Sequence, residues 1–156
     1  MPTQAGIWTR AWVCFMSKTD LAYTAGIIDG EGCIMISRVR SQRSRSGYIY
    51  GLTVAVNSTD EWLPQWLKFS FGGSITFREP HRKNESPLWM WALRSKQASD
   101  FLKLSLPYLH LKKPQAELAI KFQTRKKYGR SLPLLEEAEY IAIKAMKRKG
   151  QNVEGR

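Results

Sequence analysis

The chain of 156 residues is poor in cysteine and histidine, with two of each. Cys14 and Cys33 are too few for a disulfide framework, and they lack the spacing of a zinc site. His81 and His110 stand alone, so a histidine metal site or a nucleophile–histidine pair has little support. No apolar run approaches the roughly 20 residues that a membrane-spanning helix needs. We therefore expect reduced thiols and no membrane partner.

Acidic residues are also few, and they are unevenly distributed. Lys and Arg total 25 against 13 Asp and Glu, which gives a net charge of +12 and a pI near 10.0. Residues 32–59 contain no acid at all, but they include Arg38, Arg40, Arg43 and Arg45. This balance favours a polyanionic partner, and the alternative from charge alone is a soluble basic protein.

An apolar helix with small side chains along one face is predicted at Leu21–Gly32. Ala22, Gly26 and Gly30 recur at every fourth residue and share that face. Large aliphatic residues would bury more area there, so small ones indicate close pairing with a second copy of the helix. The helix ends at Glu31, where the negative end of its dipole disfavours a carboxylate unless a cation lies beside it. We interpret the pattern as paired helices that present two acids to metal ions.

The remaining pattern predicts a single α+β domain over residues 16–150, with a loosely packed extension at 1–15 and a frayed tail at 151–156. Residue alternation predicts strands at 33–40, 48–57, 74–78 and 88–94, and helical spacing predicts helices at 62–71, 95–106, 115–128 and 133–148. Because the strands come in adjacent pairs, we expect an antiparallel four-stranded sheet with helices on one face.

Local signals refine these elements. Ser17 or Thr19 is expected to cap the first helix, and a capping box at residues 58–61 is expected to start the second. The aromatic residues of that second helix, Trp62 among them, are expected in the core. In the second strand Leu52 is one of the residues that form the core face, and the alternating residues leave a shallow polar face that could lie in a DNA groove.

The segment Thr24-Ala-Gly-Ile-Ile-Asp-Gly-Glu-Gly32 closely resembles the signature of the LAGLIDADG homing endonucleases. It departs at Thr24, where the family usually has an aliphatic residue, and at Glu31, where aspartate is common. Further landmarks of the family follow in order: Asn57-Ser-Thr-Asp, Phe71-Gly-Gly-Ser-Ile75 and Pro107-Tyr-Leu-x-x-Lys-Lys-Pro-Gln-Ala-Glu-Leu118. The resemblance covers nearly everything from Met16 to Tyr128 and implies the αββαββα fold with a saddle-shaped sheet.

The resemblance implies a site-specific endonuclease that cuts both strands of a long pseudo-palindromic DNA target in intron homing. Relatives with one signature are homodimers, and this chain shows no second copy. Glu31 would bind Mg2+, for which Mn2+ could substitute, with help from the Gly30 carbonyl. Lys112 would stabilise charge near the scissile phosphate, with Lys113 as the competing choice. Asn57 would orient water, in a register that the sequence leaves open by one residue.

Two surfaces follow from this interpretation. In the DNA interface, arginines would pair with guanine edges or phosphates and hydroxyls would read other bases. The residues expected there are Ser37, Arg38, Arg40, Arg43, Arg45, Tyr48, Thr53, Thr76, Arg78 and Lys113. The interface between paired helices is expected at Ala22, Ala25, Gly26 and Asp29, with Asp29 capping or buttressing the helices.

Other functions stay open on the same residues. An RNA-binding maturase that acts on its host intron RNA, or a DNA-binding repressor that does not cleave, would also use a basic sheet. A ribosomal or nucleoid protein would explain the charge but not the small-residue helix. Glu31 and Lys112 favour the nuclease, because a pure binder has no need of an acid beside phosphates. We expect an intracellular location, in a bacterial or phage-infected cytoplasm or an organelle.

Overall fold

The computed structural model describes residues 16–127 and 132–151, so the predicted extension at 1–15 and most of the predicted tail lie outside the described residues. The elements are α2 (Lys18–Gly30), β1 (Gly32–Arg40), β2 (Tyr48–Ser58), α3 (Trp62–Phe71), β3 (Ser74–Arg78), β4 (Leu88–Arg94), α4 (Ser95–Ser105), the 3-10 helix η2 (Leu106–Tyr108), α5 (Lys113–Lys127) and α6 (Pro133–Gln151). This order confirms the α+β class predicted from the sequence.

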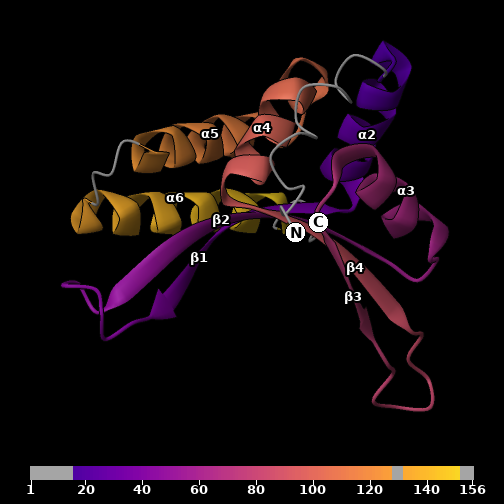
Figure 1. Cartoon of the computed structure of the whole chain (residues 1–156), viewed down its shortest axis with the longest axis horizontal. Helices are drawn as coiled ribbons and strands as arrows, with labels where there is room; N and C mark the ends of the chain where they lie inside the picture. Colours follow the sequence, from indigo (N-terminus) through magenta and orange to yellow (C-terminus); the bar gives the residue numbers. More distant parts are fainter. Residues whose placement is uncertain (1–15, 128–131, 152–156) are drawn as a thin grey trace, which may run out of the picture.

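The four strands form one antiparallel sheet in the order β1-β2-β4-β3. Helices α4, α5 and α6 cover one face of the sheet, and the β1–β2 and β3–β4 hairpins bend away from these helices and splay apart (Figure 1). The sheet therefore has the predicted saddle shape. We call the sheet face that points away from these helices the concave face.

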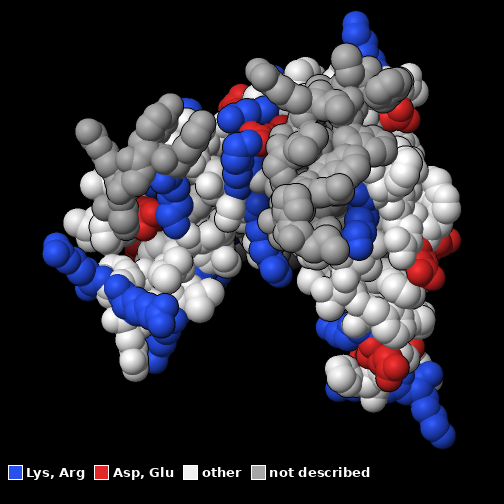
Figure 2. All heavy atoms as spheres, viewed as in Figure 1, with Lys and Arg blue, Asp and Glu red and all other residues white. Residues whose placement is uncertain are grey.

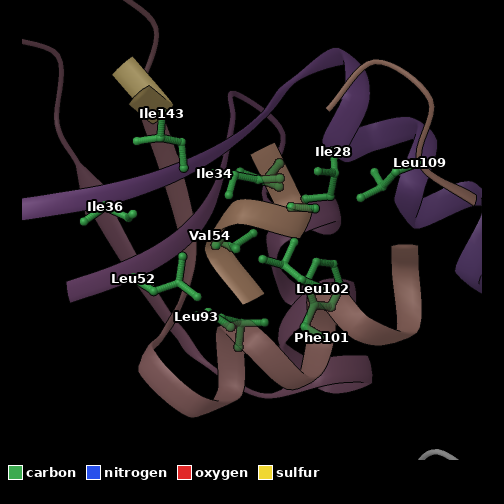
Figure 3. Packing of buried hydrophobic residues seen from close by; sticks show 14 of the residues in the cluster. Ile28, Ile34, Ile36, Leu52, Val54, Leu93, Phe101, Leu102, Leu109 and Ile143 are labelled. Carbon is green, nitrogen blue, oxygen red and sulfur yellow. The ribbon is translucent and has the colours of Figure 1, made fainter. Parts of the chain in front are cut away.

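The strand register decides which side chains reach each face. Ile34 lies opposite Val54, and Val54 lies opposite Leu93. All three side chains are buried under the helices, together with residues of α2 and α4 (Figure 3). Because side chains alternate along a strand, the neighbouring row points to the concave face, and across the same strands it consists of Met35, Thr53 and Arg94.

Helix α2 begins with a capping box. The Asp20 N–H donates to Ser17 Oγ over 3.0 Å, and the Ser17 N–H donates to Asp20 Oδ2 over 3.3 Å. Both bonds satisfy backbone donors that the first helical turn leaves free. Of the two caps that the sequence allowed, the structure has Ser17 rather than Thr19.

Helix α3 differs from expectation at its start. The predicted capping box at residues 58–61 is wrong, since Glu61 makes no capping bond through its side chain. Asp60 takes this role, and its Oδ1 accepts the Trp62 N–H over 2.8 Å. The prediction that Trp62 lies in the core is also wrong. Its side chain is 61% exposed and stacks on Trp66, with ring centroids 6.1 Å apart.

Helix α6 is anchored by apolar packing and by two ion pairs with α5. Ile143 belongs to the buried core. Arg125 of α5 donates to both carboxylate oxygens of Glu139, over 2.6 and 2.5 Å, and Lys126 lies 3.6 Å from Glu136. This anchoring lays α6 against β1, the strand at the edge of the sheet. No helix in the described part of the chain is both long and apolar enough to cross a membrane.

Two glycines with positive φ allow a test of the packing between β3 and β4. Gly73 has φ +91°, and a Cβ there would lie 2.5 Å from the Ala92 carbonyl oxygen. Gly47 has φ +76° and open space around it. Either Gly→Ala change should cost about 1–2 kcal/mol of backbone strain. Gly73→Ala should lower the free energy of unfolding in urea by roughly 2 kcal/mol more, because it adds a clash. Equal losses would contradict this packing.

Candidate metal centre and nucleic-acid interface

The candidate metal centre lies where α2 gives way to β1. The Glu31 N–H closes the helix by donating to the Ile27 carbonyl over 2.7 Å, and the strand starts at the next residue. A side chain at Gly32 would place its Cβ 2.6 Å from the Ile28 Cα, so this junction requires glycine. Because Glu31 alone separates the helix from the strand, its exposed side chain is held at the end of the helix.

Asn57 reaches the same junction from β2. Gly32 pairs with Val56, so the next step of the antiparallel register places Asn57 across from Glu31. Asn57 also pairs with Met90 of β4 and is exposed, on the concave face. The role of Asn57 in orienting water, and its register by one residue, stay predictions.

Lys112 reaches this junction, which we call the corner, from the connector between η2 and α5 (residues 109–112). Its ammonium donates to three carbonyl oxygens, those of Ile28 (2.7 Å), Asp29 (3.0 Å) and Gly32 (2.6 Å). These contacts put a positive charge at the negative end of the α2 dipole. Burial lowers the pKa of Lys112, although the charge of Asp29 opposes that shift. Lys113 is exposed at the first residue of α5, so Lys112 is the lysine brought to the corner.

Asp29 of α2 in turn binds the backbone of the connector. Its carboxylate accepts the backbone N–H groups of His110 (2.8 Å), Leu111 (3.3 Å) and Lys112 (2.9 Å). Partial burial acts to raise the pKa of Asp29, but these three donors outweigh it and lower the pKa. The predicted place of Asp29 in a helix-pairing interface stays a prediction, and within its own chain the Asp29 carboxylate holds the connector.

The face of α2 predicted to pair with another helix is open in this chain. Ala22, Gly26 and Gly30 are exposed, and a Cβ at either glycine would meet nothing within 4 Å. Ala25 was expected in the same interface, but it is 0% exposed and belongs to the core. That expectation is wrong because Ala25 faces the core beside the small-residue face.

Most predicted DNA contacts lie on the concave face or at the hairpin ends. Ser37, Thr53, Thr76 and Arg78 share the concave face by register. Arg43 and Arg45 are exposed in the turn between β1 and β2, where basic side chains gather, as they also do at the end of the β3–β4 hairpin (Figure 2). Arg94 was missed, although its alternation with the core residue Leu93 could have placed it on this face.

The structure corrects two predicted DNA contacts, Arg38 and Tyr48, which lie on the helix side of the sheet. The Arg38 guanidinium is 2.7 Å from the Glu137 carboxylate of α6 and stacks over the rings of Tyr48 and Tyr140, at 4.8 and 4.9 Å. Arg40 shares this row of β1 and is exposed near its end. Arg38 was grouped with the DNA contacts although it shares the strand row of the core residues Ile34 and Ile36. Val39, between the two arginines, is 61% exposed on the concave face.

The donors at the corner suit a hard cation. A carboxylate and a helix-end carbonyl offer oxygen ligands, which Mg2+ and Ca2+ prefer. Within the described ranges, no group of three or more His, Cys, Asp or Glu side chains could hold a metal. Glu31 and the Gly30 carbonyl thus fit a cation that completes its shell with water, phosphate or a second chain.

The fold is that of solved homing endonucleases. The structure is similar to I-CvuI in complex with DNA, with a TM-score of 0.68 and 21% identity over 82% of each chain. It is similar also to the archaeal intron-encoded I-Vdi141I complexed with DNA, with a TM-score of 0.66 and 14% identity over 83% of each chain. For I-SmaMI bound to cleaved DNA, the TM-score is 0.64 at 20% identity, over 80% of this chain and 42% of that chain.

The family model for the LAGLIDADG endonucleases matches residues 24–128, so the chain belongs to this family. The match includes the second half of α2, the whole sheet and the connector that carries Lys112. It ends before α6. No curated protein matches the chain significantly.

The contact between α6 and the sheet should depend on pH. The Tyr50 hydroxyl donates to Glu137, and this bond together with Arg38 lowers the pKa of Glu137 from its usual 4.5. A carboxyl with a lowered folded-state pKa stabilises the protein above the unfolded-state pKa, and this contribution is lost as pH falls through the folded value. Glu137→Gln should therefore destabilise the protein at pH 7, and the difference from wild type should shrink below about pH 4.5.

Urea unfolding between pH 3 and 7 measures this difference. Glu117→Gln, which removes one exposed acid from α5, is the control for net charge. If Glu137→Gln lowers the free energy of unfolding by the same amount at pH 3 as at pH 7, the ion pair does not fasten α6.

Proposed function

We propose that this protein is a site-specific, double-strand DNA endonuclease of intron homing, acting as a homodimer on a long pseudo-palindromic target with Mg2+ or Mn2+. The observation that carries the proposal is the corner at the end of α2. Glu31, Asn57 and Lys112 come from three separate parts of the chain, and the fold brings them to one place beside the concave face. Such a reaction needs an intracellular location with access to DNA, in a bacterial or phage-infected cytoplasm or an organelle.

The chemistry assigns a role to each of these residues. A bound divalent cation supplies Lewis acidity and a nucleophilic water at neutral pH. Glu31 and the Gly30 carbonyl would hold it. Asn57, with its exposed amide, would orient water by hydrogen bonding, and the Lys112 ammonium would stabilise negative charge that develops on the phosphate. Lys112 keeps the connector and the helix end together at the same time.

The concave face supports recognition of duplex DNA. Arg78 and Arg94 can pair with base edges or phosphates, and Thr53 and Thr76 offer hydroxyls that donate and accept. The arginines at the hairpin ends extend the basic surface beyond the sheet (Figure 2). One saddle covers only part of a long site, so a second copy is needed to reach the other half.

The open face of α2 supports that second copy. Pairing of two such faces would bring two Glu31 side chains close together and join two concave faces around a two-fold axis. One solved relative agrees with this assembly size. I-SmaMI, of which the chain covers 42%, is more than twice as long as the matched segment.

Relatives also support the reaction. I-CvuI is described with its target in the presence of Ca2+, and I-SmaMI is described bound to cleaved DNA. We infer the same class of substrate for this chain. Host intron RNA, as a maturase would bind, is the alternative partner that the experiments below distinguish.

Replacing the proposed metal ligand should abolish cleavage but spare binding. A plasmid that carries the uninterrupted insertion site of the gene should be cut by the wild-type protein with Mg2+. Glu31→Gln should cut it at least about a thousandfold more slowly, since it loses a charged metal ligand, and should still bind it with Ca2+. A wild-type protein that binds this DNA but never cuts it with Mg2+ or Mn2+ would indicate a repressor, and preference for intron RNA would indicate a maturase.

The glycine face of α2 gives a separate test of dimerisation. Gly26→Leu should stabilise the isolated chain by roughly 1 kcal/mol, because it adds helix propensity where a Cβ meets nothing within 4 Å. The same side chain should prevent close approach of two helices and convert the protein to a monomer in analytical ultracentrifugation. DNA cleavage should fall with it. A Gly26→Leu protein that remains a dimer would exclude this face as the interface.

A further inference from the structure

The end of α6 approaches the same corner from outside the family match. Residues 24–128 match the family model, whereas α6 spans Pro133–Gln151. Ile143 is buried in the core, and one turn later Lys147 is half-buried. The Lys147 ammonium donates to the Cys33 Sγ over 2.9 Å.

This contact places Lys147 at the edge of the concave face. Cys33 alternates with the core residue Ile34 and pairs with Ala55, so its side chain points to the side that we assign to DNA. Cys33 follows Glu31 by two residues in the sequence. The Lys112 ammonium donates to the carbonyl oxygen of Gly32, the residue just before Cys33. Lys147 also contributes to the lowered pKa of Lys112, after the larger effect of burial, which agrees with two ammonium groups lying near each other.

The surroundings of Lys147 leave its charge uncompensated. A thiol is a weak acceptor, and an ammonium group has three donors. In the described part of the chain, no ion pair joins Lys147 to a carboxylate, whereas Lys126 pairs with Glu136. The charges of Asp29 and Glu31 act on Lys112, but among the described ion pairs no carboxylate pairs with Lys147, so an anion beside Lys147 would be favourable. A backbone phosphate is such an anion, and the concave face is where DNA would supply it.

We propose that Lys147 is a further residue of the cleavage site, whose ammonium contacts a non-bridging oxygen of the phosphodiester that is cut. It acts beside Lys112, is set in place by Cys33 and the anchored α6, and stabilises negative charge as the phosphorus is attacked. The inference rests on the proposed nuclease function. It adds to that function a cation from a helix that the family match does not include.

The test compares Lys147→Met with Lys144→Met. Both changes remove one positive charge from α6, but the Lys144 ammonium donates to the Tyr140 hydroxyl over 3.0 Å and lies near Arg38. Single-turnover cleavage is measured with Mg2+ at saturating protein, the Kd for the same DNA with Ca2+, and the Tm of each variant. Lys147→Met should slow cleavage at least about tenfold with a Kd change below about threefold, and Lys147→Arg should restore most of the rate. Lys144→Met should cleave at the wild-type rate.

Several results would overturn the inference. One is a Lys147→Met rate equal to that of Lys144→Met, and another is a rate loss fully explained by Kd or Tm. If the Met variant does not fold, Lys147→Gln replaces it under the same criteria. Wild type and Glu31→Gln run in the same assay. A wild-type protein that cuts while Lys147 proves dispensable refutes this inference alone, whereas a wild-type protein that never cuts refutes the proposed function and this inference with it.

Discussion

The reciprocal contact between the end of α2 and the connector before α5 determines the geometry of the whole corner. The Lys112 ammonium enters a set of carbonyl oxygens at the helix end, and the Asp29 carboxylate accepts three N–H groups of the connector. Each charge meets the backbone dipoles of opposite sign in the other segment. The contact therefore satisfies polar groups that both segments leave free, and it holds a lysine beside an exposed glutamate without an ion pair between them.

The basic character of the chain divides into two uses. Part of it faces inward: Arg38, Arg125 and Lys126 are matched by the acids of α6, which fasten that helix to α5 and the sheet. Another part lies on the concave face and at the hairpin ends. Net charge alone therefore overstates the surface available to a polyanion, and the inward part is better understood as a means of adding a helix to the sheet.

Much of the fold was predictable because its signals are local. Alternation placed β3 and β4 at the observed residues, and the spacing of small residues identified the open face of α2. The predicted cap of α3 was wrong because Ser58 and Asp60 each accept a nearby backbone N–H group. The sequence alone does not show which of these local hydrogen bonds is the more stable. The prediction for Trp62 was wrong because helical periodicity shows which residues share a face, but not whether another part of the protein covers that face.

The candidate site was predictable in part, for reasons of the same kind. Glu31, Asn57 and Lys112 were found through motifs, and the fold places them together. Arg38 was assigned to the wrong face, although its alternation with Ile34 and Ile36 puts it on the helix side, where it meets Glu137. Lys147 carries no motif, and its position depends on how α6 lies along β1.

The junction at Gly32 has a consequence for how such a protein can change its target. Only Glu31 lies between helix and strand, and the Gly32 backbone lies too close to Ile28 for any side chain. If two α2 helices pair, the offset between the two saddles is set by that rigid joint. For the proposed nuclease, substitutions along the strands would then alter which bases are read, and the stagger between the two proposed cuts would stay the same.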